Sequence, residues 1–343
     1  MKKRITARTG TNSTACIDQA RRKTHGALAG IALALLALAS PVHAQNYPSK
    51  PVSIVVPFGP GSGTDQVARA FSQALSDELS GTPVVIDNKP GANGFLAAQA
   101  VARAPADGHT LLLTTNTTQA ANQHLFKKLP YDPVADFAPI TLLSKGAMLL
   151  IVPPASPVKS VSDLIALAKK QPGKLAFASG SSSSRIAGEL FLQMSGTQSL
   201  HVPYKSNPLA MTDLMGERIQ FMFADTLSAL PLVQSGKLRA LGYTDSQRFA
   251  GLPDLPTIAE AGVKNYEMGY WLAVYAPHGT RPEVVKRLND AFVKVAQTES
   301  VKKFLARSHM TVATSSPEGL AKFQQAEADK WGRIIKTAGI EQE

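Results

Sequence analysis

The sequence predicts an α/β fold with two lobes, each a mainly parallel sheet flanked by helices. Short β-branched runs alternate with amphipathic stretches, which is typical of parallel strands joined by right-handed crossovers. About 300 residues follow an N-terminal leader, more than one hydrophobic core usually holds. The C-terminal helices need a sheet to cover, and the first unit offers one. We therefore expect lobe 1 over 45–150 and 269–343 and lobe 2 over 151–268, with hinge crossings near 147–153 and 265–273.

The individual elements follow from hydrophobic periodicity and from turn residues. In the first unit, we predict strands over 51–57, 82–87 and 109–114 and helices over 64–79 and 93–104. In the second, we predict strands over 174–178, 201–203, 219–223 and 238–243 and helices over 161–170, 184–195 and 209–216. An extended run from Tyr266 leads into helices over 282–298, 300–307 and 316–338. Ser160 and either Thr64 or Asp65 are the expected N-caps.

The N-terminus has the pattern of a secretory signal. A basic stretch precedes the apolar run 26–39, and Val42-His43-Ala44 supplies small residues at the expected positions. The run is shorter than the roughly 20 residues that span a bilayer. We expect cleavage after Ala44 and a periplasmic protein, with an uncleaved membrane anchor as the alternative. Because the basic region is long, a translation start downstream of Met1 is also open.

Charge and cysteine content exclude several function classes. The formal net charge is +11, but removing residues 1–44 leaves 29 basic and 24 acidic side chains, a net charge of +5. No basic cluster indicates nucleic-acid binding, although a modest positive charge can draw an anion into a cleft. Cys16 lies in the leader, so the remaining chain has no disulfide, no thiolate ligand and no lipid-attachment cysteine. We expect a freely soluble monomer without metal or cofactor.

A glycine-rich turn follows the first predicted strand, within the motif Pro57–Asp65. Such a turn presents backbone N–H groups at a positive helix end, which suits a carboxylate or phosphate. The spacing fails the dinucleotide pattern G-x-G-x-x-G, although Asp87 at the end of the next strand could imitate the ribose-binding acid. A purely structural turn is the other alternative. The candidate ligand-binding residues here are Gly59, Gly61, Ser62, Gly63, Thr64 and Asp65.

A second turn, Ala178–Arg185, repeats this chemistry in the other lobe. Two helix N-termini facing each other would hold an anion from both sides, and serine hydroxyls would add donors. The candidates are Ser181, Ser182, Ser183, Ser184 and Arg185. No G-x-S-x-G motif is present and the histidines are scattered, which argues against a serine hydrolase. No His, Asp or Glu cluster has the spacing of a metal site.

Polar residues also gather around the motif Pro203-Tyr204-Lys205. Asp225 follows the predicted strand 219–223, at the carboxyl end where open α/β sheets bind ligands. A helix cap or a turn is an equal explanation for Asp225. Tyr204 is a further candidate, whereas Lys205 and Asp213 are equally explained as solvated surface residues.

Several segments resemble the substrate-binding components of tripartite tricarboxylate transporters, the Bordetella uptake gene family. These are PFGPGSGTD, IDNKPGANG, ADGHTLL, LPYDPVADFAPI, HVPYK, GKLRALGYT and LPDLPTIAEAG, in order from about Tyr47. The resemblance implies a type II-like periplasmic binding protein fold that closes on a small carboxylate. It also implies a partner permease with one large and one small membrane subunit. By motif position it adds Thr115 and Asn116 to the candidate site.

Two departures from the family pattern lie near the expected pocket. Arg185 stands where relatives commonly have histidine, and the segment 204–208 replaces the usual YKGSGP. We predict that Arg185 pairs with a ligand carboxylate, with Glu189 four residues on as the competing partner. The expected function is capture of an organic carboxylate without catalysis. A secreted two-lobe enzyme and a sensory ligand-presenting protein are the alternatives.

Overall fold

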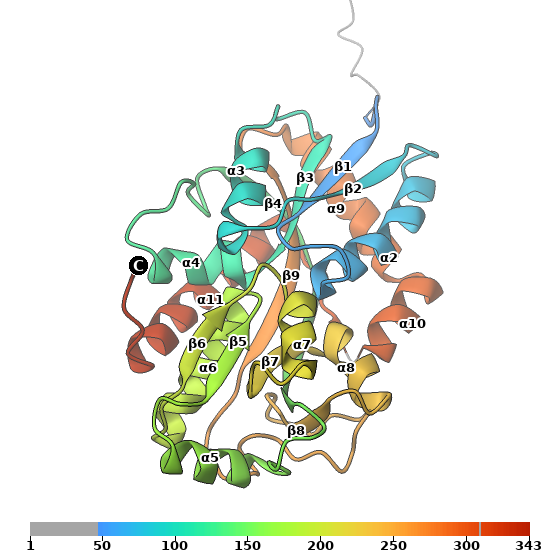
Figure 1. The fold of residues 1–343 in the computed structure, drawn as a ribbon. Coiled ribbons are helices and arrows are strands. Elements are labelled where there is room, and N and C mark those ends of the chain that lie inside the picture. Colours follow the sequence, from blue (N-terminus) through green and yellow to red (C-terminus); the bar gives the residue numbers. More distant parts are fainter. Residues whose placement is uncertain (1–46, 309) are drawn as a thin grey trace, which may run out of the picture. The chain divides into compact units, whose positions relative to one another are not determined.

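The computed structural model describes residues 47–308 and 310–343. The leader 1–44 and its expected cleavage site lie outside the described residues. Within the described part of the chain, ten strands form one sheet in the order β2-β1-β3-β9-β4-β7-β5-β6, with β8 and β10 paired to β4 (Figure 1). The strand pairing divides this sheet into two halves that meet along β4.

The first half-sheet contains the N-terminal β–α units and receives the C-terminal helices. Its strands are β1 (Val52–Val56), β2 (Val84–Asn88), β3 (Thr110–Thr115), β9 (Gly269–Pro277) and β10 (Thr311–Val312). Its helical segments are α2 (Gly63–Glu78), η1 (Ala92–Gly94), α3 (Phe95–Ala102), η2 (Thr117–Ala121), α4 (Asn122–Leu125), α9 (Pro282–Ala296) and α10 (Glu299–Arg307). Strands β1, β2 and β3 are parallel, and α2 packs against α9 (Figure 1).

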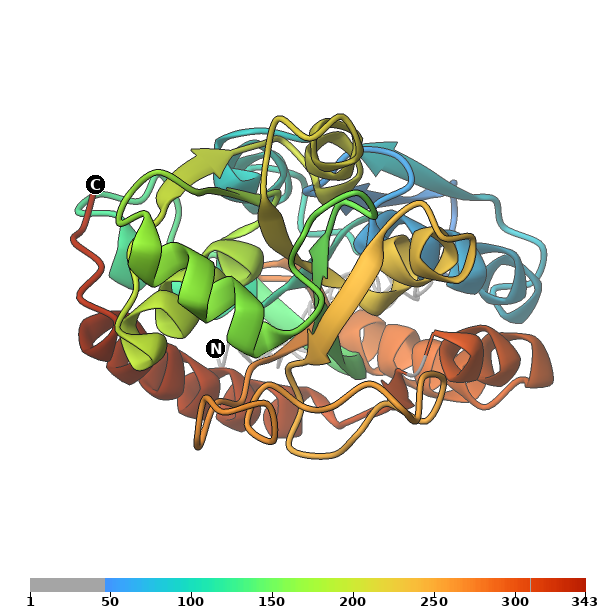
Figure 2. The ribbon, with the colours of Figure 1, turned by 60° about the horizontal axis from the view of Figure 1, so that its bottom comes forward.

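The second half-sheet is built from the middle of the chain. Its strands are β5 (Ala176–Ser179), β6 (Leu200–Pro203), β7 (Phe221–Asp225) and β8 (Arg239–Tyr243). Its helices are α5 (Val161–Lys170), α6 (Ser182–Ser195), α7 (Asn207–Met215) and α8 (Thr226–Gln234). Strands β5, β6 and β7 are parallel. Helix α11 (Pro317–Thr337) contacts both β4 and α6, and Figure 2 shows it beside the second half-sheet helices.

Strand β4 (Phe137–Val152) joins the two half-sheets. It pairs with β9 over Phe137–Ala147 and with β7 and β8 over Met148–Val152. Because β4 and β9 run antiparallel to each other and to their outer neighbours, the sheet is mixed, where a mainly parallel one was predicted. Strand β4 was not predicted because Pro139 and Gly146 interrupt the apolar run. The predicted lobe boundaries at 150 and 269 stay a prediction.

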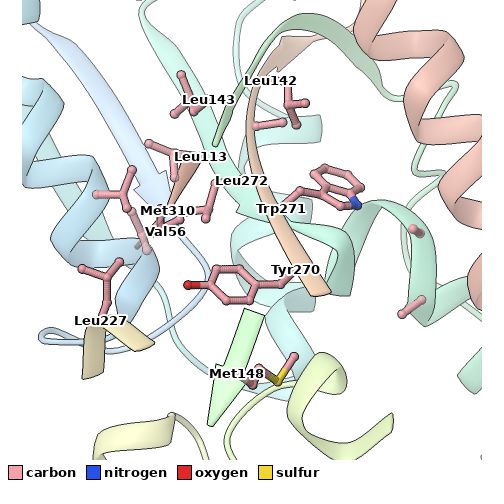
Figure 3. Packing of buried hydrophobic residues seen from close by; sticks show 14 of the residues in the cluster. Val56, Leu113, Leu142, Leu143, Met148, Leu227, Tyr270, Trp271, Leu272 and Met310 are labelled. Carbon is pink, nitrogen blue, oxygen red and sulfur yellow. The ribbon is translucent and has the colours of Figure 1, made fainter. Parts of the chain in front are cut away.

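The core follows the amphipathic pattern of the elements. Helix α2 buries Val67, Phe71 and Leu75 against the sheet, and burial of each large apolar side chain contributes about 1.5–3 kcal/mol. In β9, Tyr270 and Trp271 point to opposite sides of the strand because side chains alternate along a strand (Figure 3).

Helix N-termini are fixed by serine caps. Ser160 caps α5, as predicted, and its hydroxyl accepts from the Asp163 N–H at 3.0 Å. The prediction of Thr64 or Asp65 as the cap of α2 is wrong. Ser62 has the extended backbone (φ −64°, ψ 157°) and its Oγ accepts from the Asp65 N–H at 3.3 Å. The helix therefore begins at Gly63, one residue earlier than predicted.

Candidate functional site

A cavity lies where the turn after β1 meets the turn after β5. The first half-sheet contributes Phe58, Ser62, Gly63, Thr64, Thr115 and Tyr270 to its lining. The second contributes Met148, Gly180, Ser181, Ser183, Asn207 and Asp225. Side chains from the two half-sheets approach each other here, since the hydroxyls of Thr117 and Ser183 are 3.4 Å apart.

Four helices begin at this cavity. Gly63 is the first residue of α2 and Asn207 the first residue of α7, while Ser181 and Asp225 are the N-caps of α6 and α8. Each helix directs free N–H groups and the positive end of its dipole from its N-terminus. Among the described residues that line the cavity, none is Lys, Arg or His. An anion in the cavity would therefore be held by backbone N–H groups and hydroxyls.

The turn before α2 is held by a buried carboxylate from the same turn. Asp65 accepts hydrogen bonds from the Gly61 N–H at 2.9 Å, from Arg69 Nε at 3.0 Å and from Asn88 Nδ2 at 3.0 Å. Burial alone would raise the pKa of the Asp65 carboxyl, but the hydrogen bonds from Arg69, Gly61 and Asn88 outweigh it and lower the pKa. Asp65 thus fixes the turn as an anion, beside the cavity rather than in its lining.

The turn before α6 is held by groups from elsewhere in the chain. Ser181 Oγ accepts from the Ser184 N–H at 3.2 Å, and the Gly180 N–H donates to Asn207 Oδ1 at 3.1 Å. Ser182 Oγ donates to Asn122 Oδ1 at 2.9 Å, and Ser184 Oγ donates to the Phe223 carbonyl. No acid lies in the first turn of α6.

Asp225 lines the cavity and lies close to the start of α2. Its carboxylate accepts from Asn207 Nδ2 at 2.8 Å and from the Ser228 N–H at 2.9 Å. A Cβ on Gly63 would lie 2.5 Å from Asp225 Oδ1, and a Cβ on Gly180 would lie 2.1 Å from the Asn207 nitrogen. At Gly63 a side chain would collide with Asp225 of the other half-sheet, whereas at Gly180 it would collide with the backbone of Ser206 and Asn207 in the same half-sheet.

Apolar side chains complete the walls. Tyr270 projects from β9 near Met148 of β4 (Figure 3). Its buried hydroxyl has no hydrogen-bond partner among the described residues. Burial, and then the nearby Asp225 carboxylate, raise the pKa of the Tyr270 phenol, so the group is neutral.

The structure brings about half of the predicted site residues to the cavity. Those in the lining are Ser62, Gly63, Thr64, Thr115, Ser181, Ser183 and Asp225. Asp225 also caps α8, so the cap explanation and the pocket position both hold for it. The lining residues that the sequence analysis did not select are Phe58, Met148, Gly180, Asn207 and Tyr270.

The other predicted residues lie outside this lining, and their role in binding stays a prediction; Tyr204 lines an adjoining pocket. They are Gly59, Gly61, Asp65, Asn116, Ser182, Ser184, Arg185 and Tyr204. The Ser182 and Ser184 hydroxyls are used within the fold, and the Tyr204 hydroxyl donates to Asp213 Oδ2 at 2.7 Å. Asn116 is fully buried, and its amide has no partner among the described residues.

Arg185 has protein partners in this structure. Its guanidinium forms an ion pair with Glu343, while its Nε lies 4.0 Å from Glu189 Oε1. Two main-chain hydrogen bonds hold Glu343 against Leu125 and Lys127 of the first half-sheet. Arg185 therefore connects the start of α6 to the C-terminal segment instead of lining the cavity.

One serine–histidine pair forms that the scattered histidines did not predict. Strand pairing places Ser179 Oγ 2.7 Å from His201 Nε2. Burial, and then the positive charge of Arg185, lower the pKa of His201 to about 4, which makes it a weak base. Ser179 is buried and outside the cavity lining. The pair thus has a structural role beneath the second turn.

Two features are absent from the described residues. No group of three or more His, Cys, Asp or Glu side chains within 47–308 and 310–343 is placed to hold a metal ion. In the same part of the chain, no helix has the length and apolar character needed to cross a membrane.

Comparison with known proteins defines the class to which this fold and cavity belong. The model of the tripartite tricarboxylate transporter family receptor matches residues 67–340. BugT of Bordetella pertussis is 33% identical over 316 residues, which cover 91% of this chain and 97% of BugT. The chain belongs to this family of periplasmic solute-binding receptors.

Solved structures support the same assignment. Rpa4515 of R. palustris with adipate has a TM-score of 0.84 at 35% identity, covering 87% of this chain and 100% of Rpa4515. MatC from Rhodopseudomonas palustris with bound malate has a TM-score of 0.80 at 31% identity, covering 84% of this chain and 100% of MatC. The fold is therefore the two-lobed α/β fold of these periplasmic binding proteins, as the sequence predicted.

Proposed function

We propose that this protein captures a small organic carboxylate in the cavity between the two glycine/serine turns and delivers it to a membrane transporter. The observation that carries the proposal is the convergence of four helix N-termini on one cavity without a basic side chain. Adipate and malate, which are bound by two similar proteins, belong to this ligand class.

Binding is proposed to occur without chemical conversion. The lining supplies backbone N–H groups, hydroxyls and the neutral Tyr270 phenol, all of which stabilise a carboxylate through hydrogen bonds. Hydrogen bonds to a charged group contribute about 1.5–3 kcal/mol each. Since Thr64 and Ser183 lie on different half-sheets, a ligand that contacts both stabilises the closed arrangement. The proposed ligand-binding residues are the twelve that line the cavity.

Export and delivery complete the proposal. The basic and apolar leader supports cleavage after Ala44, and family membership supports a permease partner with a large and a small membrane subunit. We propose that the receptor acts as a monomer. A sensory role, in which the closed form is presented to a receptor, would use the same cavity.

The test is a thermal-shift and calorimetry screen of the purified protein against adipate, malate and related acids, with the corresponding diamides as neutral controls. A ligand that binds only the folded state stabilises it by about 2.7 kcal/mol at a hundredfold excess over Kd. We expect stabilisation by acids and none by amides. Conversion of the acid during incubation, or an equal response to the amides, would contradict the proposal.

A further inference from the structure

A second pocket, here called the side pocket, adjoins the cavity. It shares Phe58 and Gly180 with the cavity lining. Its other walls come from the segment after β2, which includes Gly91 and Gly94, and from the segment after β6, which ends in Lys205. The side pocket therefore lies between the same two half-sheets, and Phe58 and Gly180 mark the boundary with the cavity.

The charged residues that line the cavity and the side pocket have opposite signs. Asp225 is the charged residue of the cavity lining, and Lys205 is the charged residue of the side-pocket lining, within the part of the chain that the structure describes. Lys205 is exposed, and its ammonium group forms no ion pair or hydrogen bond with another described residue. Other basic residues nearby are paired, such as Arg218 with Asp213 at 2.8 Å.

This difference in charge limits where two carboxylates can lie. The helix N-termini stabilise one carboxylate in the cavity, but a second one beside it would be repelled by Asp225, and such repulsion is strong where water is excluded. The side pocket instead contains the positive charge of Lys205. Helix α3 also begins there, with Gly94 as an N-cap that supplies no side-chain hydrogen bond, so its first N–H groups remain available.

We propose that the side pocket binds the second carboxylate of a dicarboxylate ligand and that Lys205 determines the preference for diacids over monoacids. The inference rests on the proposed function, because it requires the first carboxylate to occupy the cavity. The ligand then passes Phe58 and Gly180, with one carboxylate on each side. Since Lys205 is exposed and unpaired, its replacement removes a ligand contact without removing a contact that holds the fold.

The experiment is calorimetry with Lys205→Met on matched pairs of acids. Succinate, glutarate and adipate are each compared with the monocarboxylate of the same chain length, up to hexanoate. For the diacid that the wild-type protein binds most tightly, we expect Kd to rise about tenfold in the variant, a typical loss for a charge-assisted hydrogen bond. For the matched monoacid we expect less than a twofold change. Lys205→Arg should retain the preference for the diacid.

Lys264→Met is the matched control, because Lys264 is also exposed and lies outside both linings. This variant should bind the diacid and the matched monoacid with unchanged Kd. The control thus shows whether an effect of Lys205→Met comes from a lost ligand contact or only from the loss of one positive charge. An equal loss for diacid and monoacid in Lys205→Met, or no loss for either, would overturn the role of Lys205. A wild-type protein that binds monoacids as tightly as diacids would also overturn it. A wild-type protein that binds neither contradicts the proposed function itself, and with it this inference.

Discussion

The turn before helix α2 and the turn before helix α6 both present serine hydroxyls and helix N–H groups to the cavity, yet they are held in place differently. The first turn is held mostly by its own segment, since Asp65 bonds to Gly61 and Arg69, with Asn88 of the neighbouring strand β2 as a further partner. The second has one local bond, from the Ser184 N–H to Ser181, and otherwise depends on partners more distant in the sequence, including Asn207 and Asn122. One wall of the cavity is thus organised within the first β–α–β unit, and the other forms only when segments from both half-sheets come together.

The largest effect is expected for Asp65→Ala in the first turn. Asp65 is 2% exposed, and its loss leaves the Asn88 amide without this acceptor. We expect the free energy of unfolding to fall by about 2–3 kcal/mol in urea titrations. Loss of the ion pair with Arg69 adds little to this decrease in stability, because the Arg69 side chain is largely exposed.

Asp163→Ala is the matched control for that measurement. Asp163 also lies in the first turn of a serine-capped helix, but it is exposed. Its replacement should lower the free energy of unfolding clearly less than that of Asp65. Equal losses in the two variants would show that Asp65 is only a helix-dipole residue and does not organise its turn.

The second turn should respond to acid through His201. The pKa of His201 is about 4 in the folded protein against an ordinary 6.5, so the unfolded chain binds more protons between these values. The full linkage value for this shift is about 3 kcal/mol between pH 6.5 and 4, and because the ring is only partly buried we expect solvent screening to reduce the loss of stability to roughly 1–2 kcal/mol. In His201→Gln this part of the pH dependence should disappear. A parallel pH profile for wild type and variant would contradict the burial of a neutral imidazole beneath the turn.

The first turn should lose stability in a lower pH window. The pKa of Asp65 is depressed below its ordinary 3.8, so its contribution is complete above that value and is lost as the pH falls through the lower pKa of the folded state. Unfolding curves of Asp65→Asn and wild type should therefore converge below pH 3.8. Convergence already near pH 5 would mean that Asp65 is not held as a buried anion.

The smallest effect is expected at Arg185, which ties the second turn to Glu343. Arg185→Ala and Glu343→Gln should each cost about 0.5–1 kcal/mol, and the double variant should cost no more than either alone. Glu341→Gln, in the same segment, is the control, since Glu341 forms no ion pair with another described residue. Additive losses in the double variant would show that the pair is not coupled.

The comparison of the turns also explains what could be predicted from the sequence. Strand β1, the following turn and helix α2 are adjacent in the chain, so Ser62, Gly63 and Thr64 could be selected from local pattern alone. Only the cap was misplaced, because the choice among neighbouring polar residues depends on which one keeps an extended backbone.

The residues that strand pairing brings to the cavity could not be predicted from the sequence. Met148 and Tyr270 line it because β4 pairs with both β7 and β9, and β4 itself was not recognised across Pro139 and Gly146. The ion pair between Arg185 and Glu343 could not be predicted because the two residues are 158 positions apart in the chain. For Asn207 there was a usable signal, since Ser206-Asn207-Pro208 marks a helix start.

The central claim, that both turns contact one carboxylate ligand, is tested most directly by amide NMR during titration with adipate or malate. The N–H signals of Thr64 in the first turn and of Ser183 in the second should shift together and fit the same Kd, because both residues line the cavity. Shifts confined to the Thr64 turn, or different dissociation constants for the two turns, would contradict capture of one ligand between them.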